Sequence, residues 1–116
     1  MSPKRKERVA PPAVDGEWDV RFGTNDAAKG WEELCRQAAG NTRAAYELMR
    51  SNPRPAEDKR HTRLRGDLAT RTFDGRALEQ WEIEVTGGGR IFYLVDDFKR
   101  TVWVVVASTR HPKSTE

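Results

Sequence analysis

The sequence contains little cysteine, little histidine and no long apolar segment. Cys35 is the only cysteine among 116 residues, so no disulfide can form within the chain, and a zinc site built on thiolates is not expected. No segment is long and apolar enough to cross a bilayer, and residues 1–16 lack the apolar run of a signal peptide. We therefore expect a cytoplasmic protein that holds no metal ion and contacts no membrane.

Basic residues exceed acidic ones only slightly, but they are unevenly distributed. The chain has 21 Lys and Arg against 18 Asp and Glu, a net charge of +3. Residues 1–16 are basic and nearly devoid of large apolar side chains, which predicts a flexible basic tail before a single domain over residues 17–116. Further basic residues crowd the middle of the chain: Arg54, Lys59, Arg60, Arg63, Arg65, Arg71 and Arg76. This group suits a phosphate backbone, and a solvated arginine-rich surface is the alternative.

The first half of the domain reads as a strand followed by two helices. Apolar residues alternate over residues 17–22, as in a half-buried strand. An apolar stripe with helical spacing then covers residues 27–38, with Thr24 or Asn25 as the helix cap. Residues 40–42 are predicted to break this helix, and a second short helix completes a helical hairpin.

The second half reads as strands. Their predicted ranges are residues 61–65, 77–85, 90–95 and 101–107. Residues 67–76 are polar, and Asp74-Gly75 indicates a turn. The continuous apolar run of the last strand predicts burial on both faces, as in a central strand. We therefore predict an α+β fold, in which helices cover one face of a largely antiparallel sheet and the other face stays accessible.

The large aromatic residues and the single cysteine are predicted to lie in the core. They are Trp18, Trp31, Trp81, Trp103, Tyr93 and Cys35. His61 is predicted to be a surface residue of its strand.

Three charged side chains are predicted to share the accessible face of the sheet. Glu82 and Glu84 alternate with apolar residues that face the core, and Arg90 opens the next strand. Between these strands, residues 87–89 are three glycines, which permit the positive φ of a tight turn. The glutamates either form part of a functional site or are solvent-facing residues paired with neighbouring arginines across the sheet.

The hairpin supplies the most specific pattern in the sequence. A strand and a short polar turn are followed by Arg-x-x-Tyr-x-Val-x-Asp, starting at Arg90. The string Arg-Leu-Arg-Gly at residues 63–66, the strand that contains Trp81 and the segment Ser-Thr-Arg-His-Pro-Lys at residues 108–113 accompany it. Over about residues 17–113 the chain resembles the RelE/ParE superfamily of bacterial toxins.

This resemblance implies one fold with two activities. RelE-type toxins are ribosome-dependent endoribonucleases that cut mRNA, whereas ParE-type toxins share the fold and poison DNA gyrase. Both are neutralised by a partner antitoxin. We therefore expect an mRNA endoribonuclease that uses no cofactor and whose partners are the ribosome, mRNA and an antitoxin. A gyrase-binding toxin, or a RelE-fold protein that has lost activity, is the alternative.

The resemblance also assigns roles to residues. By position, Arg90 corresponds to the arginine that binds the scissile phosphate, and Arg110 to the basic residue after the last strand. The residues expected to contact nucleic acid are Arg60, Arg63, Arg65 and Lys113. Some relatives carry two lysines where this chain has Glu82 and Glu84, and no tyrosine follows Tyr93.

Cleavage of RNA by its own 2′-hydroxyl needs a base, a cation on the phosphate and an acid for the leaving group. Arginine suits the phosphate because its planar fork grips two oxygens. Glutamate can be the base, and histidine can be the acid near neutral pH. The candidate catalytic set is Glu82 or Glu84 as base, His111 as acid, and Arg90 with Arg110 on the phosphate.

Overall fold

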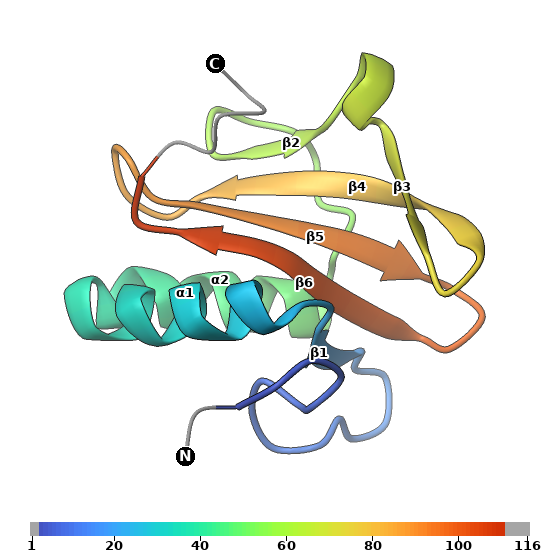
Figure 1. Cartoon of the computed structure of the whole chain (residues 1–116), viewed down its shortest axis with the longest axis horizontal. Coiled ribbons are helices and arrows are strands. Elements are labelled where there is room, and N and C mark those ends of the chain that lie inside the picture. Colours follow the sequence, from blue (N-terminus) through green and yellow to red (C-terminus); the bar gives the residue numbers. More distant parts are fainter. Residues whose placement is uncertain (1–2, 111–116) are drawn as a thin grey trace.

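The computed structural model describes residues 3–110 and has an α+β fold, as predicted (Figure 1). Its elements, in chain order, are β1 (Asp19–Phe22), α1 (Asn25–Gln37), α2 (Ala39–Ser51), β2 (His61–Arg63), the short 3-10 helix η1 (Gly66–Leu68), β3 (Thr70–Phe73), β4 (Arg76–Glu84), β5 (Arg90–Asp96) and β6 (Thr101–Ser108). No helix within residues 3–110 has the length and apolar character needed to cross a membrane.

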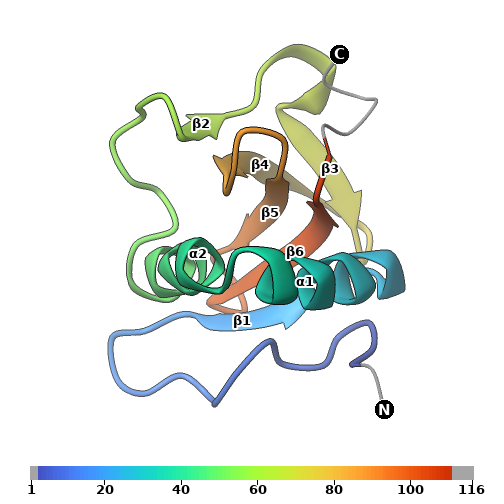
Figure 2. The same ribbon diagram turned by 90° about the vertical axis from the view of Figure 1, so that its left-hand side faces the viewer.

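The strands form one mixed sheet. Its order is β1-β6-β5-β4-β2, and β3 also pairs with β4. β1 runs parallel to β6, whereas the other pairs are antiparallel. β6 therefore lies inside the sheet, which confirms the prediction of a central last strand. Both helices lie against one face of the sheet, as Figure 2 shows from the side.

The helical hairpin begins where the sequence predicts, but its break lies elsewhere. The Thr24 side chain accepts a hydrogen bond from the amide of Ala27 and caps α1. The predicted break at residues 40–42 is wrong: the helices separate at Ala38, and residues 40–42 belong to the first turn of α2. Their polar side chains form bonds outside that turn, since Asn41 donates to the carbonyl of Val85 and Thr42 to that of Leu34.

The face of the sheet away from the helices is less open than predicted. Leu64, Phe73 and neighbouring apolar residues pack there against Phe92, Leu94 and Trp103, and form a second core cluster. The segment that covers this cluster includes β3, which the sequence analysis missed. Three of the four β3 side chains are exposed, so the strand has no apolar alternation to detect. The turn at Asp74-Gly75 was correctly placed, and both residues have positive φ there.

Part of the segment predicted to be a flexible tail is paired with β1. The amides of Lys6 and Val9 donate to the carbonyls of Phe22 and Val20 at 2.6 and 2.8 Å, and the amide of Phe22 donates to Glu7. Lys6 also forms an ion pair with Asp74. Backbone pairing of this kind does not depend on apolar side chains, so composition gave no sign of it.

Gly30 lets α1 approach β6 closely. A Cβ atom at this position would lie 1.7 Å from the carbonyl oxygen of Ala107, which is backbone and cannot move aside cheaply. Gly40 in α2 has no atom within 4 Å of the corresponding position.

We therefore expect opposite effects from two matched substitutions. Gly30→Ala should lower the free energy of unfolding by about 3 kcal/mol through overpacking. Gly40→Ala should raise it by about 0.5 kcal/mol, because alanine loses less backbone entropy in a helix. Urea unfolding followed by tryptophan fluorescence measures both. Equal effects of the two substitutions would contradict this packing.

Asp96 is a fully buried carboxylate at the end of β5. Arg76 donates to both of its oxygens at 2.9 and 2.6 Å, Trp103 donates its ring N–H at 3.1 Å, and the amide of Lys99 donates at 3.1 Å. Burial alone would raise the pKa of Asp96, but these hydrogen bonds outweigh burial and lower the pKa to about 2.

This lowered pKa predicts a pH-dependent contribution to stability. The ionised carboxylate stabilises the fold fully above the unfolded-state pKa near 4, and the contribution is lost as the pH falls through about 2. The stability gap between wild type and Asp96→Asn should therefore narrow by about 2 kcal/mol between about pH 6 and about pH 2. Urea unfolding across this range tests it, with the exposed Asp15→Asn as control. A gap that stays constant with pH would contradict the assigned role.

Candidate functional site

Arg90 lies at the start of β5, opposite Glu84 of β4 and Ser108 of β6. Only 8% of the residue is exposed. Its guanidinium forms ion pairs with Glu82 at 3.4 Å and with Glu84 at 3.7 Å. It also donates to the carbonyls of Thr86 and Gly89 at 3.0 and 2.9 Å. Arg90 thus holds the β4–β5 turn closed from within, between two carboxylates and the turn carbonyls.

One glycine of this turn, Gly89, serves close packing. Glycines 87–89 do not adopt positive φ, contrary to the prediction. A Cβ atom on Gly89 would lie 2.8 Å from the Thr86 hydroxyl, which accepts a hydrogen bond from the Gly89 amide. Gly89 therefore has to be small because the Thr86 hydroxyl and Leu34 of α1 leave no room for a side chain, whereas a Cβ atom on Gly87 would meet nothing within 4 Å.

Glu82 and Glu84 share the face of Arg90, as predicted. Their side chains are 19% and 34% exposed, so Glu84 is the more accessible of the two. Both pair with Arg90 rather than with Arg63 or Arg65. Each carboxylate is partly exposed to solvent. The Arg90 cation therefore holds two groups that can accept a proton.

Arg110 follows β6 and is exposed. Its amide donates to the Ser108 hydroxyl at 3.1 Å. A Cβ atom on Gly88 would lie 4.0 Å from the Cα of Arg110, so this residue passes beside the glycine turn. The structure thus brings Arg110 to the same end of the sheet as Glu84 and Arg90. His111 and Lys113 lie outside the described residues.

Three other predicted nucleic-acid contacts, Arg60, Arg63 and Arg65, lie in β2 or within two residues of its ends. Arg65 forms hydrogen bonds to Glu57 at 3.1 and 3.0 Å, and these bonds, with one from the Arg63 amide, lower the pKa of Glu57. The Arg63 guanidinium lies 3.7 Å from Glu79. Arg65 and Arg63 are therefore paired with acids away from Arg90.

Arg60 is the member of this group closest to the Arg90 cluster. It is exposed, and its carbonyl accepts a hydrogen bond from the amide of Glu84 at 2.8 Å. Of the predicted β2 contacts, Arg60 is thus the one placed directly beside the candidate site.

His61 has a neighbour that the sequence analysis did not foresee. Its ring lies 3.3 Å from Asp58, and it lines a small cavity of about 150 Å³ that Glu84 and Asn41 also line. The three-residue spacing from Asp58 was visible in the sequence, but only the turn between them brings the side chains together.

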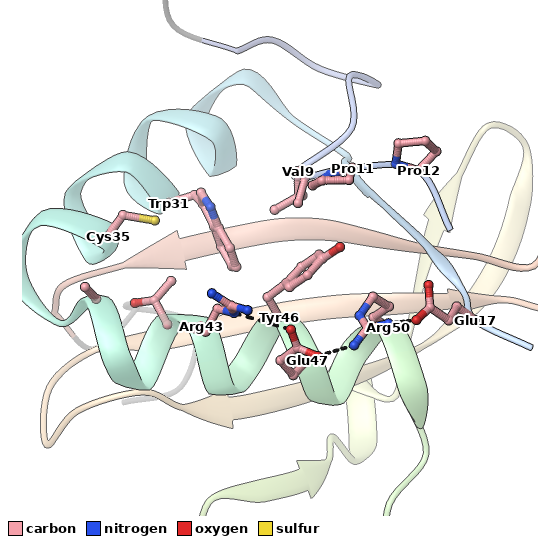
Figure 3. A pocket seen from close by; sticks show the side chains of 13 residues that line it. Val9, Pro11, Pro12, Glu17, Trp31, Cys35, Arg43, Tyr46, Glu47 and Arg50 are labelled. Carbon is pink, nitrogen blue, oxygen red and sulfur yellow. Dashed lines mark hydrogen bonds and ion pairs between the residues drawn. The ribbon is translucent and has the colours of Figure 1, made fainter. Parts of the chain in front are cut away.

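A larger groove of about 540 Å³ lies between the helices and residues 9–12 (Figure 3). Trp31 of α1 and Tyr46 of α2 project toward this groove, and Val9 and Pro11 form its opposite wall. Cys35 also lines it and is exposed, so its predicted burial is wrong. The apolar stripe of α1 ends at Leu34, and Cys35 lies just beyond its edge. Burial of the sulfur by its surroundings still raises the pKa of the Cys35 thiol.

The remaining predicted core residues are placed as expected, with one exception. Trp31, Trp81, Trp103 and Tyr93 are buried, whereas Trp18 is only partly buried and packs at the edge of the core. Within residues 3–110, no three His, Cys, Asp or Glu side chains gather closely enough to hold a metal ion.

The chain was also compared with known proteins. No family model, curated protein or solved structure matches the chain. The resemblance to RelE/ParE toxins therefore rests on the sequence motifs alone, and the function follows below as a proposal.

The burial of Arg90 predicts a structural cost for its removal. Arg90→Ala would leave two carboxylates and the turn carbonyls without their cation, and should lower the free energy of unfolding by about 3 kcal/mol. Arg110→Ala, on an exposed residue, should change it by less than about 0.5 kcal/mol. Urea unfolding of both variants provides the measurement. Equal stability of Arg90→Ala and wild type would refute the assigned role of Arg90.

Proposed function

We propose that this protein is a RelE-type toxin, an mRNA endoribonuclease that cleaves by attack of the RNA 2′-hydroxyl. The observation that carries the proposal is the cluster at one end of the sheet. There a partly exposed carboxylate, Glu84, is held by Arg90 beside the turn that Arg110 passes. This cluster supports the proposal because it offers a proton acceptor and a cation close to one another.

The geometry refines the role of each residue in this proposal. Glu84 is the base, because it is more exposed than Glu82. Arg90 positions Glu84, since its guanidinium is already shared between the turn carbonyls and the two glutamates. Arg110, which is exposed, meets the phosphate. His111, the next residue in the chain, is the proposed acid.

The proposed partners follow from the same reaction. The substrate is mRNA on the ribosome, so the protein acts in the cytoplasm, and an antitoxin neutralises it. The mechanism assigns its base and its phosphate contact to side chains of this chain and requires no cofactor. Arg60, beside Glu84, is the basic residue best placed to contact the RNA next to the cleaved bond.

The test is to express the chain briefly in a bacterial host and to map the 5′ ends of cellular mRNAs. We expect new cuts in coding regions, in phase with codons. Glu84→Gln and Arg110→Ala should each reduce the frequency of these cuts by about 100-fold or more. The first removes the base and the second removes the cation on the phosphate. Glu33→Gln and Arg36→Ala, exposed on α1, are the matched controls and should cut like wild type. Unchanged mRNA in arrested cells would exclude the nuclease.

A second function is favoured by one observation. Arg90, the residue that the resemblance assigns to the scissile phosphate, is largely buried and engaged within the protein. A toxin that binds DNA gyrase would need no exposed cation at this point. In that case Glu84→Gln and Arg110→Ala would still arrest growth, and DNA breaks would accumulate with intact mRNA. A chain that causes neither arrest nor cleavage would be a RelE-fold protein without activity.

A further inference from the structure

Phe98 is the most exposed large apolar side chain within residues 3–110. It lies at the tip of the β5–β6 turn and is 86% exposed, whereas the next such residue, Val14, is 69% exposed. Lys99 and Arg100 follow it directly in the sequence, and both are exposed. An isolated exposed apolar residue needs no explanation, but this ring is held in place and is flanked by cations.

A chain of contacts fixes the position of the ring. The Arg76 guanidinium lies 5.6 Å from the centre of the Phe98 ring. Arg76 is in turn anchored by two hydrogen bonds to the buried carboxylate of Asp96. Asp96 also accepts a hydrogen bond from the amide of Lys99, on the other side of Phe98 in the turn. Arg76 therefore lies against one face of the ring, and the Lys99 amide fixes the backbone of the turn that carries Phe98.

A groove of about 420 Å³ lies beside the ring. Phe98, Arg76, Arg54 and Arg63 line it, together with Glu79 and Asp97. Arg54 is bound to both acids at 2.6 to 2.9 Å, and the side-chain hydrogen bonds to Asp97 and Glu79 raise the pKa of Arg54 against the effect of burial. The groove itself is thus close to neutral.

Two further cations, Lys99 and Arg100, follow Phe98 in the chain. Lys99 and Arg100 form no ion pair within the described part of the chain. Their side chains lie over the rings of Trp103 and Trp18, and Arg100 also donates to the carbonyl of Gly16 at 3.2 Å. Counted with the groove, this end of the sheet carries more basic than acidic side chains. The basic ones are Arg54, Arg63, Arg76, Lys99 and Arg100, and the acidic ones are Glu79, Asp96, Asp97 and Asp74, whose charge acts on Arg76 and Lys99.

We propose that this end of the sheet is a binding site for single-stranded RNA, in which a base stacks on Phe98 and the neighbouring phosphates meet Lys99 and Arg100. Proteins bind single strands without sequence preference by combining aromatic stacking surfaces with basic side chains. A ring held in advance of binding loses little conformational freedom when a base stacks on it. Duplex RNA does not fit, because its bases are already stacked on one another.

This site is distinct from the cluster around Glu84. Arg90 and Asp96 occupy opposite ends of β5, a strand of seven residues, so the two sites lie about 20 Å apart. The inference rests on the proposed function in one respect, since it gives the mRNA substrate a second contact. It predicts RNA binding by the isolated protein, which is measured without any cleavage.

The test is the fluorescence anisotropy of a labelled, unstructured RNA of about 12 nucleotides, a length in the range that one single-strand binding site covers. Phe98→Ala should weaken binding by about five-fold to about 100-fold, and Phe98→Trp should restore it. Val14→Ala removes the other exposed apolar side chain and should bind like wild type. Because Phe98 is exposed, its variants should unfold at the temperature of wild type, so a loss of binding reports on contact rather than on folding.

The cationic part of the site is tested through salt dependence. Lys99→Ala should reduce the slope of log affinity against log salt by about 1, since one phosphate contact is lost. Lys29→Ala, an exposed lysine on α1, should leave the slope unchanged. A duplex of the same sequence should bind more weakly than the single strand.

Three outcomes would overturn the inference. They are no RNA binding by wild type, wild-type binding by Phe98→Ala, and equal binding of duplex and single strand. Wild-type RNA binding by Phe98→Ala together with loss of growth arrest would show that this surface meets a protein. These outcomes are independent of the nuclease test, because RNA binding by the isolated protein is measured without any cleavage, and Glu33→Gln, exposed on α1, should bind RNA like wild type. Binding that depends on Phe98, with no cleavage in cells, would support this site and exclude the nuclease.

Discussion

The two middle strands, β5 and β6, must be covered on both faces, and most of the structure follows from that requirement. All seven residues of β5 are buried, alternately in the cluster under the helices and in the cluster under residues 64–73. The helical hairpin covers one face, and the segment with η1 and β3 covers the other. Charged side chains can then enter the middle of the sheet only at the strand ends. This explains why Arg90 begins β5 and Asp96 ends it.

These two residues solve the same physical problem with opposite charges. A buried charge is tolerated only when it is paired and its hydrogen bonds are satisfied. Arg90 forms ion pairs with two glutamates and donates to the turn carbonyls. Asp96 accepts hydrogen bonds from Arg76, Trp103 and a backbone amide. Each pairing fixes a turn and leaves exposed groups beside it. At the first end this group is the partly exposed Glu84, and at the second it is the exposed Phe98.

Much of the fold was predictable because it depends on local patterns. The strand–helix–helix order, the α1 cap, the two β-hairpin turns and the shared face of Glu82, Glu84 and Arg90 follow from periodicity and turn residues. Several of the failures share one cause, which is that the deciding contact lay far away in the sequence. β3 and the pairing of residues 6–9 with β1 depend on distant backbone partners. The exposure of Cys35 depends on where the helix packing ends.

The sequence by itself determined which residues alternate, where turns form and which charges share a face, because these properties depend on neighbours along the chain. Only the tertiary structure decided how accessible those charges are. Arg90 has the position expected of a phosphate-binding arginine, yet the closed turn and both glutamates surround it. Phe98 carries no motif, and it becomes a candidate binding surface only because Asp96 anchors Arg76 next to its ring. Burial and pairing arise between segments, so no single stretch of the chain encodes them.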